Sequence, residues 1–229
     1  MKRPIVLALA LVLIMPALLS AQSIPQLKAS ADEAVKTAAA APNDYAANWK
    51  AAQACRKYGD EMVVQQSEGW KNLAKAVARD GMKYGEIATK VNPKGIEGWY
   101  WYGLNVGTYS DCVSILTALS DGLKGKTQKS FETSYGLDKS YDNGGPILAL
   151  GRFWQVLPGI AGKDLKKAEQ LFNEYIALFG ASADANKDAW YYRGSLYKER
   201  GKIAEARADL QKAVSMGQKD APKLLAELK

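Results

Sequence analysis

Apolar residues recur every three or four positions along most of this chain, which is the spacing of helices that bury one face. Pro, Gly, Asn and Asp residues interrupt the pattern at 42–43, 59–60, 92–93, 125, 143–146, 158–159 and 180. The pattern predicts helices over 31–41, 45–58, 72–91, from 99 onwards, and over 111–123, 127–137, 147–156 and 164–179, followed by a helix pair within 188–218. No segment alternates with period two for long. The predicted fold class is therefore all-α, without strands.

The segment 188–218 has the spacing of one tetratricopeptide (TPR) repeat, which is a helix-turn-helix unit. The repeat positions hold large and small residues in order: Trp190, Gly194, Tyr197, Gly201, Ala206, Leu210 and Ala213. A glycine on the first helix lets the second helix approach its backbone closely. Because such a unit buries its residues against neighbouring repeats, further units are expected earlier in the chain.

Looser units do precede it. Gly103 follows Trp99 at the same interval, and Trp49 marks an earlier helix that comes after a leading half-repeat over 31–41. Between 99 and 151 the spacing breaks, because two helices are predicted where a plain repeat needs one. The sequence predicts a TPR-like helical solenoid of roughly four irregular helix pairs, with an inserted helix and capping helices. These elements form a single domain over 24–229.

The N-terminal end predicts export. Lys2 and Arg3 precede an apolar run over 5–19, which has the length of a signal-peptide core and is short for a membrane span. We predict that residues 1–23 are a cleaved signal peptide and that the mature protein is soluble and periplasmic. The alternative is an uncleaved N-terminal anchor. No lipid anchor is expected, because Gln22 stands where a bacterial lipoprotein has its acceptor cysteine.

Composition argues against catalysis. The chain has no histidine, which excludes Ser-His-Asp and Cys-His nucleophiles and zinc sites that use histidine. Neither paired carboxylates nor a phosphate-binding glycine loop stands out. We therefore predict no enzymatic activity, no metal site and no cofactor.

Charge and cysteine content add two expectations. The formal net charge of +7 falls to +5 without Lys2 and Arg3, and the remaining lysines are scattered along helical faces. Nucleic-acid binding is therefore not favoured. Cys55 and Cys112 are the only cysteines. In an exported protein they could form a disulfide, and the alternative is two buried free thiols.

Four segments carry a resemblance to a known family. They are 99–105 (WYWYGLN), 141–146 (YDNGGP), 150–153 (LGRF) and 157–159 (LPG). Together they resemble the T-component (TatT) proteins of TPR-associated TRAP transporters, and the likeness is strongest over 96–216. The GGP turn with the following Gly-Arg helix is more specific than the repeat pattern itself. One departure is that the archetype is a lipoprotein, whereas this chain lacks the acceptor cysteine.

The resemblance implies a periplasmic, non-enzymatic accessory protein of a TRAP-type importer. Such a protein associates with the solute-binding protein of the transporter and helps to deliver a small organic ligand, hydrophobic or acidic. A second hypothesis is a general TPR-mediated scaffold for protein or peptide partners in the bacterial envelope. A homo-oligomer is compatible with both.

Candidate binding residues follow from the repeat register. Five side chains are predicted on the concave side of the solenoid: Tyr100, Leu104, Arg152, Tyr191 and Ser195. Tyrosines give rigid contact area with a hydroxyl group, and Arg152 could pair with a ligand carboxylate or with Asp142. Asn105 either contacts ligand or satisfies a neighbouring backbone group. Gly144 and Gly145 could cradle an anion before Pro146, or serve turn geometry alone.

Overall fold

The structure, a computed structural model, describes residues 23–66 and 68–228 of the protein. These residues form eleven α-helices and one short 3-10 helix, and they contain no strand. The elements are α1 (Ile24–Ala40), α2 (Tyr45–Gln65), α3 (Trp70–Val91), α4 (Ile96–Asp111), α5 (Ile115–Ser120), α6 (Leu123–Asp138), α7 (Tyr141–Val156), η1 (Gly159–Ala161), α8 (Leu165–Phe179), α9 (Asp188–Glu199), α10 (Ile203–Ser215) and α11 (Ala221–Ala226). The all-α fold class is confirmed.

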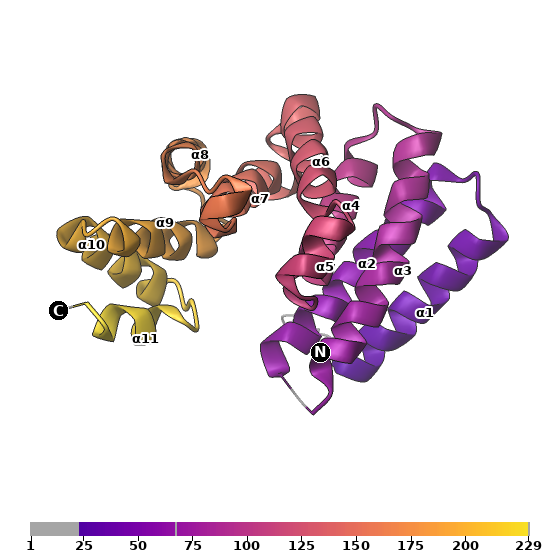
Figure 1. Ribbon diagram of the computed structural model, residues 1–229, viewed down its shortest axis with the longest axis horizontal. Coiled ribbons are helices and arrows are strands. Elements are labelled where there is room, and N and C mark those ends of the chain that lie inside the picture. Colours follow the sequence, from indigo (N-terminus) through magenta and orange to yellow (C-terminus); the bar gives the residue numbers. More distant parts are fainter. Residues whose placement is uncertain (1–22, 67, 229) are drawn as a thin grey trace, which may run out of the picture.

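The helices follow one another across the molecule as in a solenoid. Figure 1 shows α1 to α6 at one end, α7 and α8 in the middle, and α9 to α11 at the other end. Neighbouring helices pack in pairs, α2 on α3, α4 on α6, α7 on α8 and α9 on α10. The short α5 stands between the two partners α4 and α6 as the inserted helix. The predicted TPR-like arrangement of irregular pairs is thus present.

Glycines on the first helix of three pairs sit directly under the second helix. A Cβ atom at Gly103 would lie 2.7 Å from Phe131 of α6, and one at Gly151 would lie 2.7 Å from Phe172 of α8. A Cβ atom at Gly194 would lie 2.9 Å from Leu210 of α10. Real Cβ contacts are not this short, so only glycine permits these approaches. The spacing that linked Trp190 to Gly194 therefore reports a real helix contact.

The large apolar side chains are concentrated in the C-terminal half. One core cluster spans α6 to α11 and includes the fully buried Phe172, Tyr175, Leu196 and Leu210. The N-terminal helices pack in smaller clusters that rely on alanine, such as Ala38 and Ala51. A bridging cluster of Ala52, Tyr100 and Trp101, with Tyr141 and Ala149 against it, joins the two halves. That bridge lies beneath the groove described below.

Several predicted boundaries are wrong. Gly59 and Asp60 do not end a helix, because α2 continues to Gln65, and Gly125 lies within α6. The inserted helix covers only Ile115–Ser120, since α4 itself runs to Asp111. The leading helix begins at Ile24 rather than at 31. At Gly59, packing against Thr108 and Val77 of neighbouring helices lets α2 continue past a residue with low helix propensity.

The predicted signal peptide, 1–23, lies outside the described residues except for Ser23, so its cleavage stays a prediction. Within 23–66 and 68–228, no helix combines the length and apolar character needed to cross a bilayer.

Candidate functional site

A large groove opens where the two halves of the solenoid meet. Its volume is about 760 Å³, which falls within the range of small-molecule sites. Residues of α2, α4, α5, α6, α7, η1 and α9 line it, so the groove exists only in the folded arrangement of both halves. In Figure 1, α7 lies between α6 on one side and α9 on the other.

Two helices supply the walls through regularly spaced residues. On α4 the lining residues are Tyr100, Trp101, Leu104, Gly107, Ser110 and Asp111, and on α7 they include Gly145, Leu148, Ala149, Arg152 and Val156. Steps of three and four residues keep these side chains on one face of each helix. One face of α4 and one face of α7 are therefore committed to the groove.

Arg56 of α2 links α2 to α4 at the bottom of the groove. Its Nη1 donates to the carbonyl oxygen of Leu104 at 3.0 Å and also to the hydroxyl of Thr108. Its Nε lies 2.8 Å from Oδ2 of Asp60, although the N–H is not aimed at that oxygen. Burial nevertheless raises the pKa of Asp60, with Arg56 opposing the shift. The positive charge of Arg56 is thus already compensated by Asp60 within the protein.

Arg152 of α7 is held differently. Its guanidinium carbon lies 4.7 Å from the ring centroid of Tyr192, and its Nη1 donates to Oε1 of Gln155 at 2.9 Å. Gln155 is buried, and its Nε2 donates to the carbonyl oxygen of Tyr192 at 3.0 Å. Burial, with a smaller contribution from Asp188, raises the pKa of Tyr192 to about 12. Arg152 is therefore oriented by a neutral amide and a neutral ring rather than by a carboxylate.

A left-handed turn forms one end of the groove. Asp142, Asn143 and Gly144 have φ values of 50°, 53° and 80°, in a region that asparagine, aspartate and glycine tolerate best. The turn presents Asp142 to Tyr100, whose hydroxyl donates to Oδ2 at 3.0 Å. Burial and the Asp142 charge raise the pKa of Tyr100 well above its ordinary value. Backbone strain of this kind is stored where a particular geometry is required.

The mouth of the groove is apolar. Ile115 and Leu119 of α5, Val156 of α7 and Ile160 of η1 line it, and all four are exposed, Ile160 by 93%. None of the residues in α5 is buried. Apolar side chains gathered at a cavity mouth, rather than scattered singly, are typical of binding sites.

Asp111 stands inside the groove without a cation within 4.0 Å among the described residues. Its side chain is accessible to water, but the surrounding walls reduce its hydration. This desolvation raises the pKa of its carboxyl group, while Arg56 and Arg152 lower it. Asp111 also ends α4, where a negative charge opposes the helix dipole. Both effects penalise the charged form in the folded protein.

We therefore expect Asp111→Asn to stabilise the protein at pH 7, by on the order of 0.5 kcal/mol because solvent screens an exposed carboxylate. The folded-state pKa is raised, so the wild type is relatively most stable below the ordinary value of 3.8 and loses that advantage as pH rises through the raised pKa. The gain from Asp111→Asn should accordingly shrink as pH falls through the raised pKa and vanish only below pH 3.8. Thermal unfolding of both proteins between about pH 3.5 and 7.5 measures it, and a gain that did not shrink on acidification would contradict this account.

The groove brings together some of the residues predicted from the sequence. Tyr100, Leu104, Gly145 and Arg152 line it. Arg152 forms no ion pair with Asp142 in the described part of the chain, contrary to the alternative raised for it. Tyr191 and Ser195 are partly buried residues of α9 outside the lining, and Tyr192 takes the groove position instead.

Asn105 and Gly144 serve the fold in this structure. Asn105 is fully buried, and its Nδ2 donates to the carbonyl oxygens of Ala52 and Trp101 at 2.8 Å each. It therefore satisfies backbone groups rather than facing the groove. Gly144 adopts the left-handed turn and lies under aromatic rings, since a Cβ atom there would be 2.7 Å from Phe179. Cys55 and Cys112 are free thiols, so the disulfide alternative does not hold in this structure.

Three groove residues, Arg56, Asp111 and Tyr192, were not predicted from the sequence. Arg56 and Asp60 are spaced as an i,i+4 ion pair, a signal that was available but did not locate the pair. Tyr192 is adjacent to the predicted Tyr191, and a shift of one position turns a side chain by about 100° around a helix.

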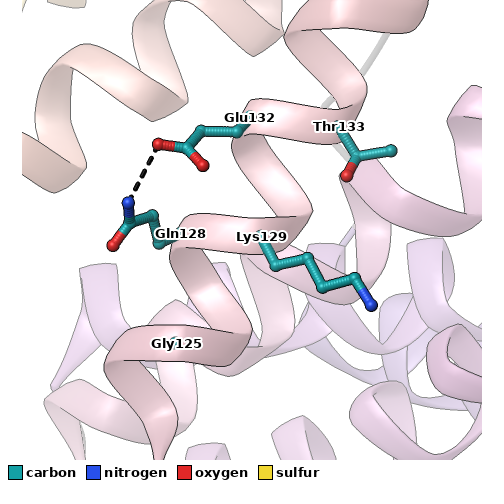
Figure 2. A pocket seen from close by; sticks show the side chains of 5 residues that line it. All are labelled: Gly125, Gln128, Lys129, Glu132 and Thr133. Atoms are coloured by element: carbon teal, nitrogen blue, oxygen red, sulfur yellow. Dashed lines mark hydrogen bonds between the residues drawn. The ribbon is translucent and has the colours of Figure 1, made fainter.

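A second hollow lies on the outer surface of α6. It is lined by Gly125, Gln128, Lys129, Glu132 and Thr133, all from that one helix (Figure 2). Nε2 of Gln128 donates to Oε1 of Glu132 at 2.9 Å, one turn away. The ammonium of Lys129 lies 5.3 Å from the ring centroid of Trp99. These are ordinary contacts of a helix surface, and the hollow adds no site.

Comparison with known proteins supports the fold alone. No protein-family model matches the chain, and no curated protein sequence matches it. A solved structure, that of a thermophilic TPR protein from Thermus thermophilus, is similar, with a TM-score of 0.62 and 14% sequence identity. The match covers 90% of this chain and 91% of that chain. The protein therefore has an all-α, TPR-like fold over nearly its whole length.

Proposed function

We propose that this protein is a non-enzymatic, periplasmic accessory of a TRAP-type transport system. In this role it binds the solute-binding protein of the transporter and holds a small organic ligand. The observation that carries the proposal is the groove between the two halves, in which the YDNGGP turn and the Gly-Arg helix of the family resemblance form one wall. TPR-like folds present such concave surfaces to partners.

The apolar mouth of the groove supports a protein partner as well. Ile160 of η1, at the mouth, is exposed by 93%, and Leu116 of α5, beside the mouth but outside the groove lining, is exposed by 79%. Neither contributes to a core cluster. Side chains of this kind become favourable contacts when a partner covers them. We take them as part of the surface that meets the solute-binding protein.

Affinity capture tests the proposal. Periplasmic extract from the source cell is passed over the immobilised protein, and we expect a TRAP solute-binding protein among the captured proteins. The double variant Leu116→Glu/Ile160→Glu should lose at least about tenfold of this capture, as expected when central interface contacts are removed. Leu137→Glu, a 40%-exposed position near the end of α6, is the matched control and should capture normally. Recovery of no solute-binding protein by the wild type would refute the transport role.

The alternative is a general TPR-mediated scaffold for envelope proteins or peptides. The regular α9–α10 pair, with Gly194 packed under Leu210, favours this class as strongly as it favours the first. Crosslinking distinguishes the two. An extended peptide crosslinked along α9 and α10 would support the general scaffold, whereas a globular partner crosslinked at α5 and η1 supports the transport accessory.

A further inference from the structure

The guanidinium of Arg152 is held in place but has no anionic partner among the described residues. Its one hydrogen bond among those residues goes to Gln155, and an arginine has five N–H donors. No carboxylate of the described chain lies within 4.0 Å of it. Gln155 and the ring of Tyr192 nevertheless fix its orientation. A held but unpaired guanidinium in a groove is suited to a bidentate anion.

The other charges of the groove set the charge of that anion. Arg56 is committed to Asp60, Asp142 accepts from Tyr100, and Asp188 accepts from Gln218 at 3.2 Å. Lys57 and Lys124 are exposed at the edge, where solvent screens them. Among the described residues inside the groove, Arg152 is the cation without an ion pair, and Asp111, Asp142 and Asp188 are carboxylates without a cation within 4.0 Å, the last two accepting hydrogen bonds from neutral donors only. A single negative charge on the ligand balances Arg152, whereas a second would meet Asp111 and Asp142.

The rest of the groove is suited to an apolar body. Leu148, Phe153 and Leu157 are buried in its wall, and Ile115, Leu119 and Ile160 remain exposed at its mouth. Val156 follows Arg152 by one helical turn, so an apolar surface begins directly beside the guanidinium. Covering these side chains would remove apolar surface from water.

From this arrangement we propose that the groove binds an amphipathic monocarboxylate, with the carboxylate on Arg152 and the apolar chain running toward α5 and η1. Arg152 is the head-group residue, and Gln155 and Tyr192 are positioning residues. Asp111 acts as a specificity-determining residue that disfavours doubly charged head groups. The ligand class rests on the proposed function, because it specifies the small organic ligand of that same groove.

Direct binding to the purified protein tests the inference. Dodecanoate, below its micelle concentration, is titrated calorimetrically and should bind saturably with a stoichiometry of about one, as one groove predicts. Dodecanol and acetate, which lack the head group or the apolar body, should each bind at least about tenfold more weakly. Dodecyl phosphate, largely a dianion at about pH 8, should also bind more weakly than dodecanoate.

Variants assign the roles. Arg152→Gln should weaken dodecanoate binding by about 10- to 100-fold, the value of a charge-assisted bidentate contact, while leaving dodecanol binding unchanged, which also shows that the groove is intact. Arg79→Gln is the matched control, because Arg79 also stacks on a tyrosine, Tyr109, at 5.4 Å but lies outside the groove. Asp111→Asn should tighten dodecyl phosphate binding more than dodecanoate binding, by about two- to fivefold.

Three results would overturn the inference: no saturable dodecanoate binding, equal binding by Arg152→Gln, or displacement of dodecanoate only by an acidic peptide. The outcome is separate from the transport role. Dodecanoate binding without capture of a solute-binding protein would support the carboxylate site and contradict the transport role. Capture without dodecanoate binding would support the transport role and contradict the carboxylate site.

Discussion

Phe172→Ala should lower the free energy of unfolding by about 3–5 kcal/mol, the cost of removing a phenylalanine from a close-packed core. Phe172 of α8 is fully buried in the large C-terminal cluster. It lies under Gly151 of α7, and its ring centroid is 6.0 Å from that of Tyr192. Because glycine on one side cannot fill the space, the cavity left by alanine should stay open. The free energy of unfolding of a domain is about 5–15 kcal/mol in total, so this substitution would remove a large share of the stability.

Urea unfolding monitored by circular dichroism measures this loss. Leu178→Ala on the same helix is the control, because Leu178 is 55% exposed and its truncation should change stability by less than about 0.5 kcal/mol. Phe172→Ala should also weaken binding in the groove, since Phe172 supports Tyr192 from behind. Equal stability of the two variants would mean that α7, α8 and α9 do not share one core.

Gly145→Ala should destabilise the protein by about 1–3 kcal/mol, the usual cost of overpacking a closely packed site. A Cβ atom at Gly145 would lie 2.2 Å from Oη of Tyr100 and 2.8 Å from its Cζ. Tyr100 is buried and cannot move aside without breaking its hydrogen bond to Asp142. The substitution should therefore displace the wall of the groove as well as lower stability.

The matched control is the same substitution at Gly107, which also lines the groove on α4. A Cβ atom at Gly107 would have nothing within 4 Å. Alanine is favoured over glycine inside a helix by about 1 kcal/mol, so Gly107→Ala should stabilise the protein. The two variants, compared by thermal unfolding, are thus expected to shift the melting temperature in opposite directions. A loss of stability at Gly107, or none at Gly145, would contradict the described packing.

The existence of the helices and their pairing could be predicted because both depend on local spacing. The interval from Trp190 to Gly194 encodes a contact that the structure places at Leu210, and Gly103 repeats it. Helix ends were less predictable. Gly59 is buried within α2, where packing against other helices outweighs the weak helix propensity of glycine. A single sequence does not contain that information.

The groove could be predicted only in part, for a related reason. The α4 and α7 faces follow from helical periodicity, so Tyr100, Leu104 and Arg152 were found. Arg56 reaches the groove because α2 packs beside α4, and Tyr192 lines it where α9 contacts α7 through Gln155. Both depend on how repeats are placed relative to one another, which here departs from a regular array.

The short helix α5 borders the groove but contributes little to the stability of the fold, although binding and stability often depend on the same residues. No residue in it is buried, so its side chains contribute little to the core, yet Ile115 and Leu119 border the groove. Substitutions there can alter the shape and polarity of the opening at little cost in stability. Among divergent homologues, α5 should therefore vary fastest while Gly103 and Gly151 persist. It is also the natural segment in which to redesign what this scaffold accepts.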